Sequence, residues 1–253
     1  MAVSFSPQGA IGEIVLDNPP ANSYDIEFMR ELASAIAAAG DDAARVVVVR
    51  SASEKFFSAG ADVKRFLAND VEANMEMIRL AHEALASIAR SPKMFIAYIA
   101  GHALGGGLEI ALACDVRYGA EGRYRLGTPE VTLGLLPGNG GTQRLPRLIG
   151  VGPALELLLT GRQITPDEAE RLGLLSRLFA GEDEFRAHVE NLAALPPLAL
   201  SEIKRAVYEG VNRSLDDGLE LERQLIEKLF RSQDASEGLS AFVEKRTPEF
   251  VGA

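Results

Sequence analysis

One carboxylate stands in a stretch that is otherwise almost wholly apolar or glycine. Glu109 follows three glycines, Gly105 to Gly107, and is flanked by Leu108 and Ile110. Because burying an ionised carboxylate is costly, a protein normally pairs such a group, hydrogen-bonds it or raises its pKa toward neutrality. Glu109 is therefore a candidate general acid or base, and a structural ion pair is the alternative that composition leaves open.

The glycines before Glu109 would let a ligand approach the main chain closely, since they carry no Cβ. If a helix begins at Gly107, its first amides have no partners within the helix, and the positive helix end favours negative charge. Such amides suit an oxyanion. One short segment could therefore supply both an anion-stabilising donor and a proton-transfer group.

A second stretch that could bind a ligand is SEKFFSAGADVK, from Ser53 to Lys64. The residues from Ser58 to Ala61 are all small, which makes their amides accessible, and Lys64 and Arg65 place positive charge nearby. Accessible amides beside two cations could hold a phosphate-bearing ligand. The alternative is an ordinary glycine turn with solvated cations.

Two further stretches lie between residues 127 and 142. Gly127-Thr128-Pro129-Glu130 is typical of a helix start, with threonine as the cap, proline at the first position and glutamate near the positive end. The glycine-rich loop from Leu135 to Thr142 matches neither GxGxxG nor a Walker A sequence. A dinucleotide or nucleoside triphosphate site therefore has no support.

The elements that must position these stretches follow a parallel α/β pattern. Apolar runs from Ile11 to Leu16, Val46 to Val49 and Met94 to Ala100 are typical of strands, and helical spacing from Ile26 to Ile36 separates the first two. The four valines indicate a strand covered on both faces. Loops after the carboxyl ends of parallel strands usually bind ligands, and the first two glycine-bearing stretches occupy that position.

The whole chain has the composition of a folded globular protein. Of its 253 residues, 47% are hydrophobic and 25% are charged, which argues against disorder. The net charge of -10 argues against nucleic acid or an anionic membrane as the main partner. The most apolar run, Met94 to Leu108, is shorter than the ~20 residues that a membrane-spanning helix needs. We therefore expect neither nucleic-acid nor membrane binding.

Cysteine and histidine usage bears on compartment and on metal binding. The single cysteine, Cys114, excludes an internal disulfide framework, and no secretory leader opens the chain, so we expect a cytoplasmic protein. The three histidines, His82, His102 and His188, lack the spacing of metal ligands, and no HExxH or CxxC sequence occurs. We expect no metal site.

The end of the chain, after Pro197, is predicted to be essentially helical. Six apolar residues there fall within an arc of roughly 140° at ~100° per residue; they are Leu215, Leu219, Leu225, Ile226, Leu229 and Phe230. Such a wide apolar face must cover its own core or another subunit. This pattern favours a homo-oligomer.

Three motifs closely resemble those of the crotonase superfamily in order and spacing. They are FFSAGADVK from Phe56, AGHALGGGLEIALACD from Ala100 and GTPEVTLGLLPGNGGTQRLPRLIG from Gly127. Within the superfamily they match enoyl-CoA hydratases best, and the similarity extends to the ending EGLSAFVEKRTPEF. The resemblance implies an α/β fold, a crotonase-like spiral of ββα units with C-terminal helices that form trimers or hexamers. It divides the chain into a spiral core with the CoA-ester site, residues 1–194, and a helical oligomerisation subdomain, residues 195–253.

The resemblance also implies an oxyanion hole built from the backbone amides of Ala61 and Gly106. Each such donor is worth roughly 3 kcal/mol toward a transition state with an enolate oxygen. Two glutamates would handle water and the proton, Glu109 mainly as the base and Glu130 mainly as the acid. Because the two carboxylates are coupled, their pKa values belong to the pair.

The CoA part of the substrate would lie against two groups of residues by the same resemblance. One group follows the second predicted strand and the other lies near the C-terminus, where a neighbouring subunit often contributes; together they are Ser58, Ala59, Gly60, Ala61, Asp62, Lys64, Phe242 and Lys245. The partner implied is an acyl-CoA thioester. Since CoA is part of the substrate, no separate cofactor is implied.

The activity implied is hydration of a trans-2-enoyl-CoA to the 3-hydroxyacyl-CoA. One carboxylate must deprotonate water while another supplies a proton to the α-carbon. The alternatives are a Δ3,Δ2-enoyl-CoA isomerase, a hydratase specialised for branched or aromatic acyl groups, and an inactive RNA-binding relative. Retention of both glutamates favours hydration, and the acidic net charge speaks against RNA.

The chain departs from the common hydratase pattern at several positions. Tyr24 and Asp25 replace the small or aliphatic residues often seen after the early asparagine, and Asn139 stands where alanine or an aromatic residue is frequent. One extra residue lies between the two glutamates. These departures leave the acyl-chain preference open and bear on the relative placement of Glu109 and Glu130.

Overall fold

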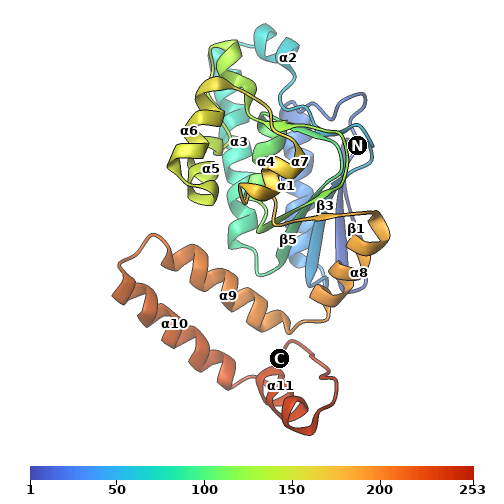
Figure 1. Ribbon diagram of the computed structural model, residues 1–253, viewed down its shortest axis with the longest axis vertical. Coiled ribbons are helices and arrows are strands. Elements are labelled where there is room, and N and C mark those ends of the chain that lie inside the picture. Colours follow the sequence, from blue (N-terminus) through green and yellow to red (C-terminus); the bar gives the residue numbers. More distant parts are fainter.

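The computed structural model describes residues 1–253 and is built around a six-stranded sheet (Figure 1). The strands lie in the order β1-β2-β3-β5-β7-β9. β1 and β2 pair antiparallel, and every later pairing in this sheet is parallel. The bounds of these six strands are, in the same order, Val3–Gln8, Ile11–Leu16, Val46–Ser51, Met94–Ile99, Val116–Ala120 and Arg177–Phe179.

A second, smaller sheet contains three short parallel strands in the order β4-β6-β8. β4 (Phe56–Ser58) follows β3, β6 (His102–Leu104) follows β5, and β8 (Leu126–Gly127) follows β7. From β3 to β8, each turn of the chain therefore adds one strand to each sheet before the next helix. This arrangement is the α/β spiral of ββα units that the resemblance to the crotonase superfamily implies.

The run of four valines in β3 is buried on both faces of the main sheet, as predicted. Val47 and Val49 belong to the larger core cluster, which α1 (Ile26–Asp41) and α3 (Val71–Arg90) cover. Val46 and Val48 belong to a second cluster with α8 (Glu182–Ala193). Successive side chains of a strand point to opposite faces, so helices on both sides require a continuous apolar run.

Short helices connect the strands and carry the candidate loops. They are α2 (Val63–Ala68), α4 (Gly106–Ala113), the 3-10 helix η1 (Pro129–Leu133), α5 (Gly141–Ile149), α6 (Val151–Thr160) and α7 (Pro166–Arg171).

Two of these helix starts differ from the prediction. α4 begins one residue before Gly107, because Gly105, with φ of 55°, takes the N-cap position. The segment after Thr128 forms one short 3-10 helix, and the Thr128 side chain makes no capping hydrogen bond. The Thr128 hydroxyl is instead buried without a partner.

The C-terminal helices α9 (Pro197–Gly210), α10 (Leu215–Phe230) and α11 (Gln233–Glu244) extend away from the sheets (Figure 1). α10 packs on α9 and buries Leu221 and Leu225. Other apolar side chains of α10 stay exposed, with Leu215 at 78% and Phe230 at 69%. The predicted apolar face is therefore only partly covered within one chain.

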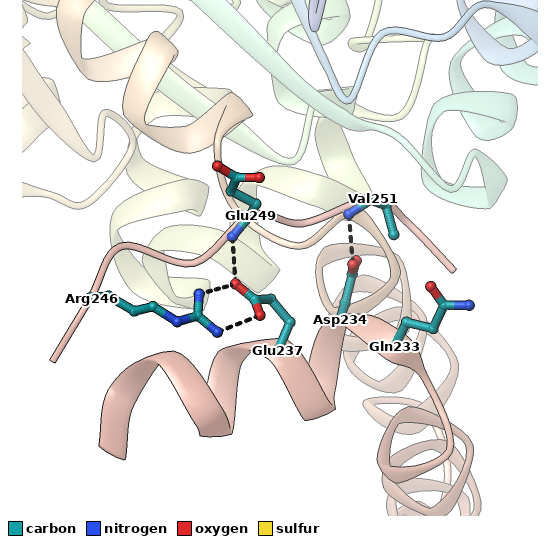
Figure 2. A pocket seen from close by; sticks show the side chains of 6 residues that line it. All are labelled: Gln233, Asp234, Glu237, Arg246, Glu249 and Val251. Atoms are coloured by element: carbon teal, nitrogen blue, oxygen red, sulfur yellow. Dashed lines mark hydrogen bonds and ion pairs between the residues drawn. The ribbon is translucent and has the colours of Figure 1, made fainter. Parts of the chain in front are cut away.

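The last residues fold back onto α11 and line an open hollow of about 310 Å³ (Figure 2). Asp234 is buried and accepts hydrogen bonds from the amides of Val251 (2.7 Å) and Gly252 (3.1 Å). Glu237 pairs with Arg246. These carboxylates are used to hold the end of the chain in place.

None of the helices combines the length and the apolar character needed to span a bilayer.

Candidate active site

The glycine-rich segment leads from β6 into α4, all of whose residues are buried. The Gly105 amide donates to the Gly127 carbonyl (2.8 Å), which fixes the turn before the helix. Gly107 lies against the backbone of Ser58: a Cβ built at Gly107 would be only 2.3 Å from the Ser58 carbonyl oxygen. The start of α4 is therefore in direct contact with the segment around the end of β4.

Two backbone amides at this junction have no hydrogen-bond partner. The bridge between Tyr24 and Ala61 uses the amides of Tyr24 and Asp62, which leaves the Ala61 N–H free. Gly106 is the first residue of α4, and its N–H has no acceptor either. A Cβ built at Gly60 would lie 3.3 Å from the Gly106 nitrogen, so the two loops meet here. The two amides assigned to an oxyanion hole thus lie at one junction, and neither has a hydrogen-bond partner.

Glu109 is only 1% exposed, and its Oε1 accepts hydrogen bonds from the amides of Asn139 (2.8 Å) and Gly141 (2.6 Å). It forms no ion pair, since the guanidinium of Arg144 donates to the Asn139 carbonyl instead (2.8 Å). The alternative interpretation, that Glu109 belongs to a structural ion pair, is therefore wrong. Burial raises the pKa of Glu109 to about 7, with the charge of Glu130 adding to the rise and the two amides opposing it.

Glu130 reaches the same place from η1. Its Oε1 is 2.7 Å from the position that a Cβ would take at Gly105, and its Oε2 is buried without a partner. Burial raises the pKa of Glu130 as well. Because its charge also raises the pKa of Glu109, the two carboxylates lie close enough to interact.

Tyr24 and Asn139 also belong to this site, although the sequence identifies them only as departures from the family pattern. Tyr24 is 3% exposed, and its Oη lies 1.9 Å from the position of a Cβ at Gly106. Asn139 Nδ2 donates a hydrogen bond to that oxygen (2.7 Å). The two residues are 115 positions apart, so no local pattern indicates the contact. The only sign in the sequence that they belong to the site is that both differ from the residues common at these positions in the family.

The residues from Ser58 to Lys64, predicted to contact CoA, run from the end of β4 into the start of α2. Ser58 is buried, and its hydroxyl donates to the Asn22 carbonyl (2.7 Å), which fixes the loop. Ala59 donates its amide to the Ala21 carbonyl (2.9 Å). The Asp62 carboxylate caps α2 by accepting from the Lys64 amide (3.0 Å), while the Lys64 side chain is exposed.

Phe242 and Lys245 do not join this loop within one chain. Phe242 lies in α11 and is 85% exposed, and Lys245 ends that helix. α2 and α11 lie at opposite ends of the molecule (Figure 1). A second chain would have to supply these two residues if they contact the same ligand as Lys64.

The histidines have structural contacts away from the glutamates. His102 Nδ1 accepts from the Arg125 amide (3.1 Å), and His82 Nε2 lies 2.6 Å from the Gly138 carbonyl oxygen. His188 Nε2 lies 3.0 Å from the Tyr118 hydroxyl. No group of three or more His, Cys, Asp or Glu side chains is arranged to hold a metal ion.

A parallel spiral of ββα units with two free amides beside a buried glutamate, Glu109, and a half-buried one, Glu130, defines a crotonase-type protein. The chain belongs to the enoyl-CoA hydratase/isomerase family, whose model matches residues 6–253. It is 41% identical over 248 residues to a probable enoyl-CoA hydratase of Rhizobium meliloti strain 1021, covering 96% of this chain and 95% of that protein.

Two further relatives support the same assignment. The chain is 37% identical over 243 residues to the 2,3-dehydroadipyl-CoA hydratase of Escherichia coli K12, covering 94% of each protein. A crystal structure of an enoyl-CoA hydratase from Bacillus anthracis matches it with a TM-score of 0.95 at 37% identity, over the full length of both chains. The family and the fold predicted from the three motifs are confirmed.

Proposed function

We propose that the protein hydrates trans-2-enoyl-CoA thioesters to 3-hydroxyacyl-CoA products. The observation that carries this proposal is that a buried and a half-buried glutamate, Glu109 and Glu130, lie beside two unpaired amides. Addition of water needs a base for the water, a proton for the α-carbon and a stabiliser for the enolate oxygen. Glu109, Glu130 and the amides of Ala61 and Gly106 would provide these three functions.

In the proposed mechanism the thioester oxygen accepts hydrogen bonds from the Ala61 and Gly106 amides as negative charge develops on it. Each donor stabilises that transition state by roughly 3 kcal/mol. Water loses a proton to Glu109 as its oxygen bonds to the β-carbon, and Glu130 delivers a proton to the α-carbon. A pKa of about 7 suits Glu109 to exchange a proton near neutral pH.

We propose that the CoA part lies along the segment from Ser58 to Asp62, with Lys64 near its phosphates. Phe242 and Lys245 would approach from a neighbouring copy of the chain. A few local cations explain how a chain with a net charge of -10 could bind an anionic thioester. CoA is part of the substrate, and the proposed reaction needs no separate cofactor.

The expected assembly is a homo-oligomer, either a trimer or a hexamer. The exposed apolar side chains of α10, including Leu215 and Phe230, need a covering surface. Sedimentation of the purified protein should give a mass of three or six chains, and Phe230→Glu should reduce it. A monomer at micromolar concentration would contradict this proposal.

Crotonyl-CoA tests the proposed reaction directly, because hydration removes the ultraviolet absorbance of the conjugated enoyl thioester. We expect rapid loss of absorbance with the wild type and at least 100-fold slower loss with Glu130→Gln, which keeps the size of the side chain but cannot donate a carboxyl proton. Butyryl-CoA should bind both proteins equally. Glu121→Gln, at an exposed position, is the matched control and should keep full activity.

Other outcomes of the crotonyl-CoA measurement point to the alternatives. Binding of butyryl-CoA without loss of crotonyl-CoA would refute hydration of short enoyl groups and favour double-bond isomerisation or a larger acyl substrate. Failure to bind any acyl-CoA would refute the enzyme proposal and favour the inactive RNA-binding relative, whose RNA affinity should fall steeply with salt.

A further inference from the structure

The hydroxyl of Tyr24 lies on the face of α4 that carries Glu109. Its oxygen is 1.9 Å from the position of a Cβ at Gly106, so it packs directly against the Gly106 backbone. Gly106 and Glu109 are three residues apart in the helix, and their Cα–Cβ bonds therefore point to the same side. The hydroxyl therefore packs against the first residue of α4, on the side of the helix from which the Glu109 side chain projects.

The orientation of this hydroxyl is set by Asn139. Asn139 Nδ2 donates to Tyr24 Oη (2.7 Å), and Asn139 Oδ1 is buried without a partner. In this orientation of the amide the Tyr24 proton points away from Asn139 and has no protein acceptor, whereas the opposite orientation would let Oδ1 accept it. The backbone of Asn139 is held in place, since its N–H donates to Glu109 and its carbonyl oxygen accepts from Arg144 (2.8 Å). A buried donor without an acceptor costs free energy, and it is expected where a ligand supplies the acceptor.

The charge state of Tyr24 suits hydrogen-bond donation. Burial raises the pKa of Tyr24 strongly, and the nearby charges of Glu109 and Glu130 raise it further. The phenol therefore keeps its proton throughout the neutral pH range. It can donate a hydrogen bond but cannot act as a base.

We propose that the Tyr24 hydroxyl is a third hydrogen-bond donor to the thioester oxygen, beside the amides of Gly106 and Ala61. The inference rests on the proposed function, since it requires an enolate oxygen at that place. Asn139 is a positioning residue that turns the hydroxyl proton toward the substrate. No proton is transferred in this step; the hydrogen bond strengthens as negative charge develops on the oxygen.

Tyr24→Phe tests the proposal, because it removes only the hydroxyl and keeps the ring that packs on Gly106. We expect kcat for crotonyl-CoA to fall about 100-fold, with KM changed much less, as for loss of one oxyanion donor. Tyr98→Phe is the matched control, since Tyr98 is a buried tyrosine of the second core cluster. It should keep the wild-type kcat.

A second readout uses acetoacetyl-CoA, whose enolate absorbs in the near ultraviolet. Binding to the wild type should increase the enolate fraction of this probe, and Tyr24→Phe should reduce the enolate-to-keto ratio about tenfold. A purely structural role would lower the thermal stability but leave that ratio unchanged. If Tyr24→Phe fails to fold, Asn139→Ala replaces it and should also lower the ratio.

The two measurements separate this inference from the proposed function. Wild-type protein that fails to hydrate crotonyl-CoA, yet stabilises the enolate through Tyr24, would refute the hydratase proposal and support the third donor. Wild-type hydration with unchanged kcat and enolate ratio in Tyr24→Phe would refute the third donor alone. Absence of both activities in the wild type would refute both.

Discussion

The Glu109→Gln variant is expected to fold and to bind butyryl-CoA normally, while its kcat for crotonyl-CoA falls by about 10³-fold or more. Glutamine is nearly the same size as glutamate, and its side-chain oxygen can still accept from the amides of Asn139 and Gly141. It cannot take a proton from water. Steady-state kinetics together with butyryl-CoA affinity measure both parts of the expectation.

The control for this variant is Glu190→Gln, at an exposed position on α8. It should leave kcat and butyryl-CoA affinity unchanged. A folded Glu109→Gln protein with wild-type kcat would exclude Glu109 as the base. A variant that cannot fold would indicate that the two hydrogen bonds to Glu109 serve the structure first.

The same variant should also change how stability depends on pH. The pKa of Glu109 is raised from 4.5 to about 7 by burial, so the wild type loses stability as the pH rises through that window. Above it the loss amounts to roughly 3 kcal/mol of the free energy of unfolding. Glutamine does not titrate, so the stability of Glu109→Gln relative to the wild type should increase between pH 5 and pH 8. Urea titrations at both pH values measure the difference, and a constant difference would contradict a buried, pKa-shifted Glu109.

Features that depend on local composition could be predicted from the sequence. The valines of β3 indicate burial on both faces, and a lone carboxylate among apolar residues indicates a shifted pKa at Glu109. The assignment of the Ala61 and Gly106 amides to an oxyanion hole came from the resemblance to the crotonase superfamily and stays a prediction about function; the structure places the loops that carry them side by side. The burial of β3 and the raised pKa of Glu109 could be predicted because each depends on residues that are neighbours in the chain.

Features that depend on contacts between distant segments could not be predicted in this way. The hydrogen bond between Asn139 and Tyr24 joins two loops that meet only through folding. The threonine of Thr128-Pro129-Glu130 fits a capping pattern, yet its hydroxyl is buried while the segment forms a short 3-10 helix that directs Glu130 to the turn before α4. Tertiary contacts override the local capping preference there.

The Gly107→Ala variant is expected to lose both stability and activity. A Cβ at Gly107 would lie 2.3 Å from the carbonyl oxygen of Ser58 and 2.8 Å from its carbonyl carbon. Because these are backbone atoms, the clash is relieved only if α4 moves away from the segment at the end of β4. We expect the free energy of unfolding to fall by about 3 kcal/mol. We also expect kcat for crotonyl-CoA to fall by about 100-fold, since the movement carries the Gly106 amide away from the Ala61 amide.

Gly152→Ala in α6 separates this effect from a general cost of adding a methyl group. A Cβ at Gly152 meets no atom within 4 Å, and alanine favours a helix over glycine by up to about 1 kcal/mol, so this control should be at least as stable as the wild type. Kinetics of Gly107→Ala are measured at a temperature where urea titration finds it folded. Full kcat under those conditions would mean that the close contact serves packing alone. Reduced kcat in the folded variant would mean that the contact between α4 and Ser58 holds the two amides at the spacing that the reaction needs.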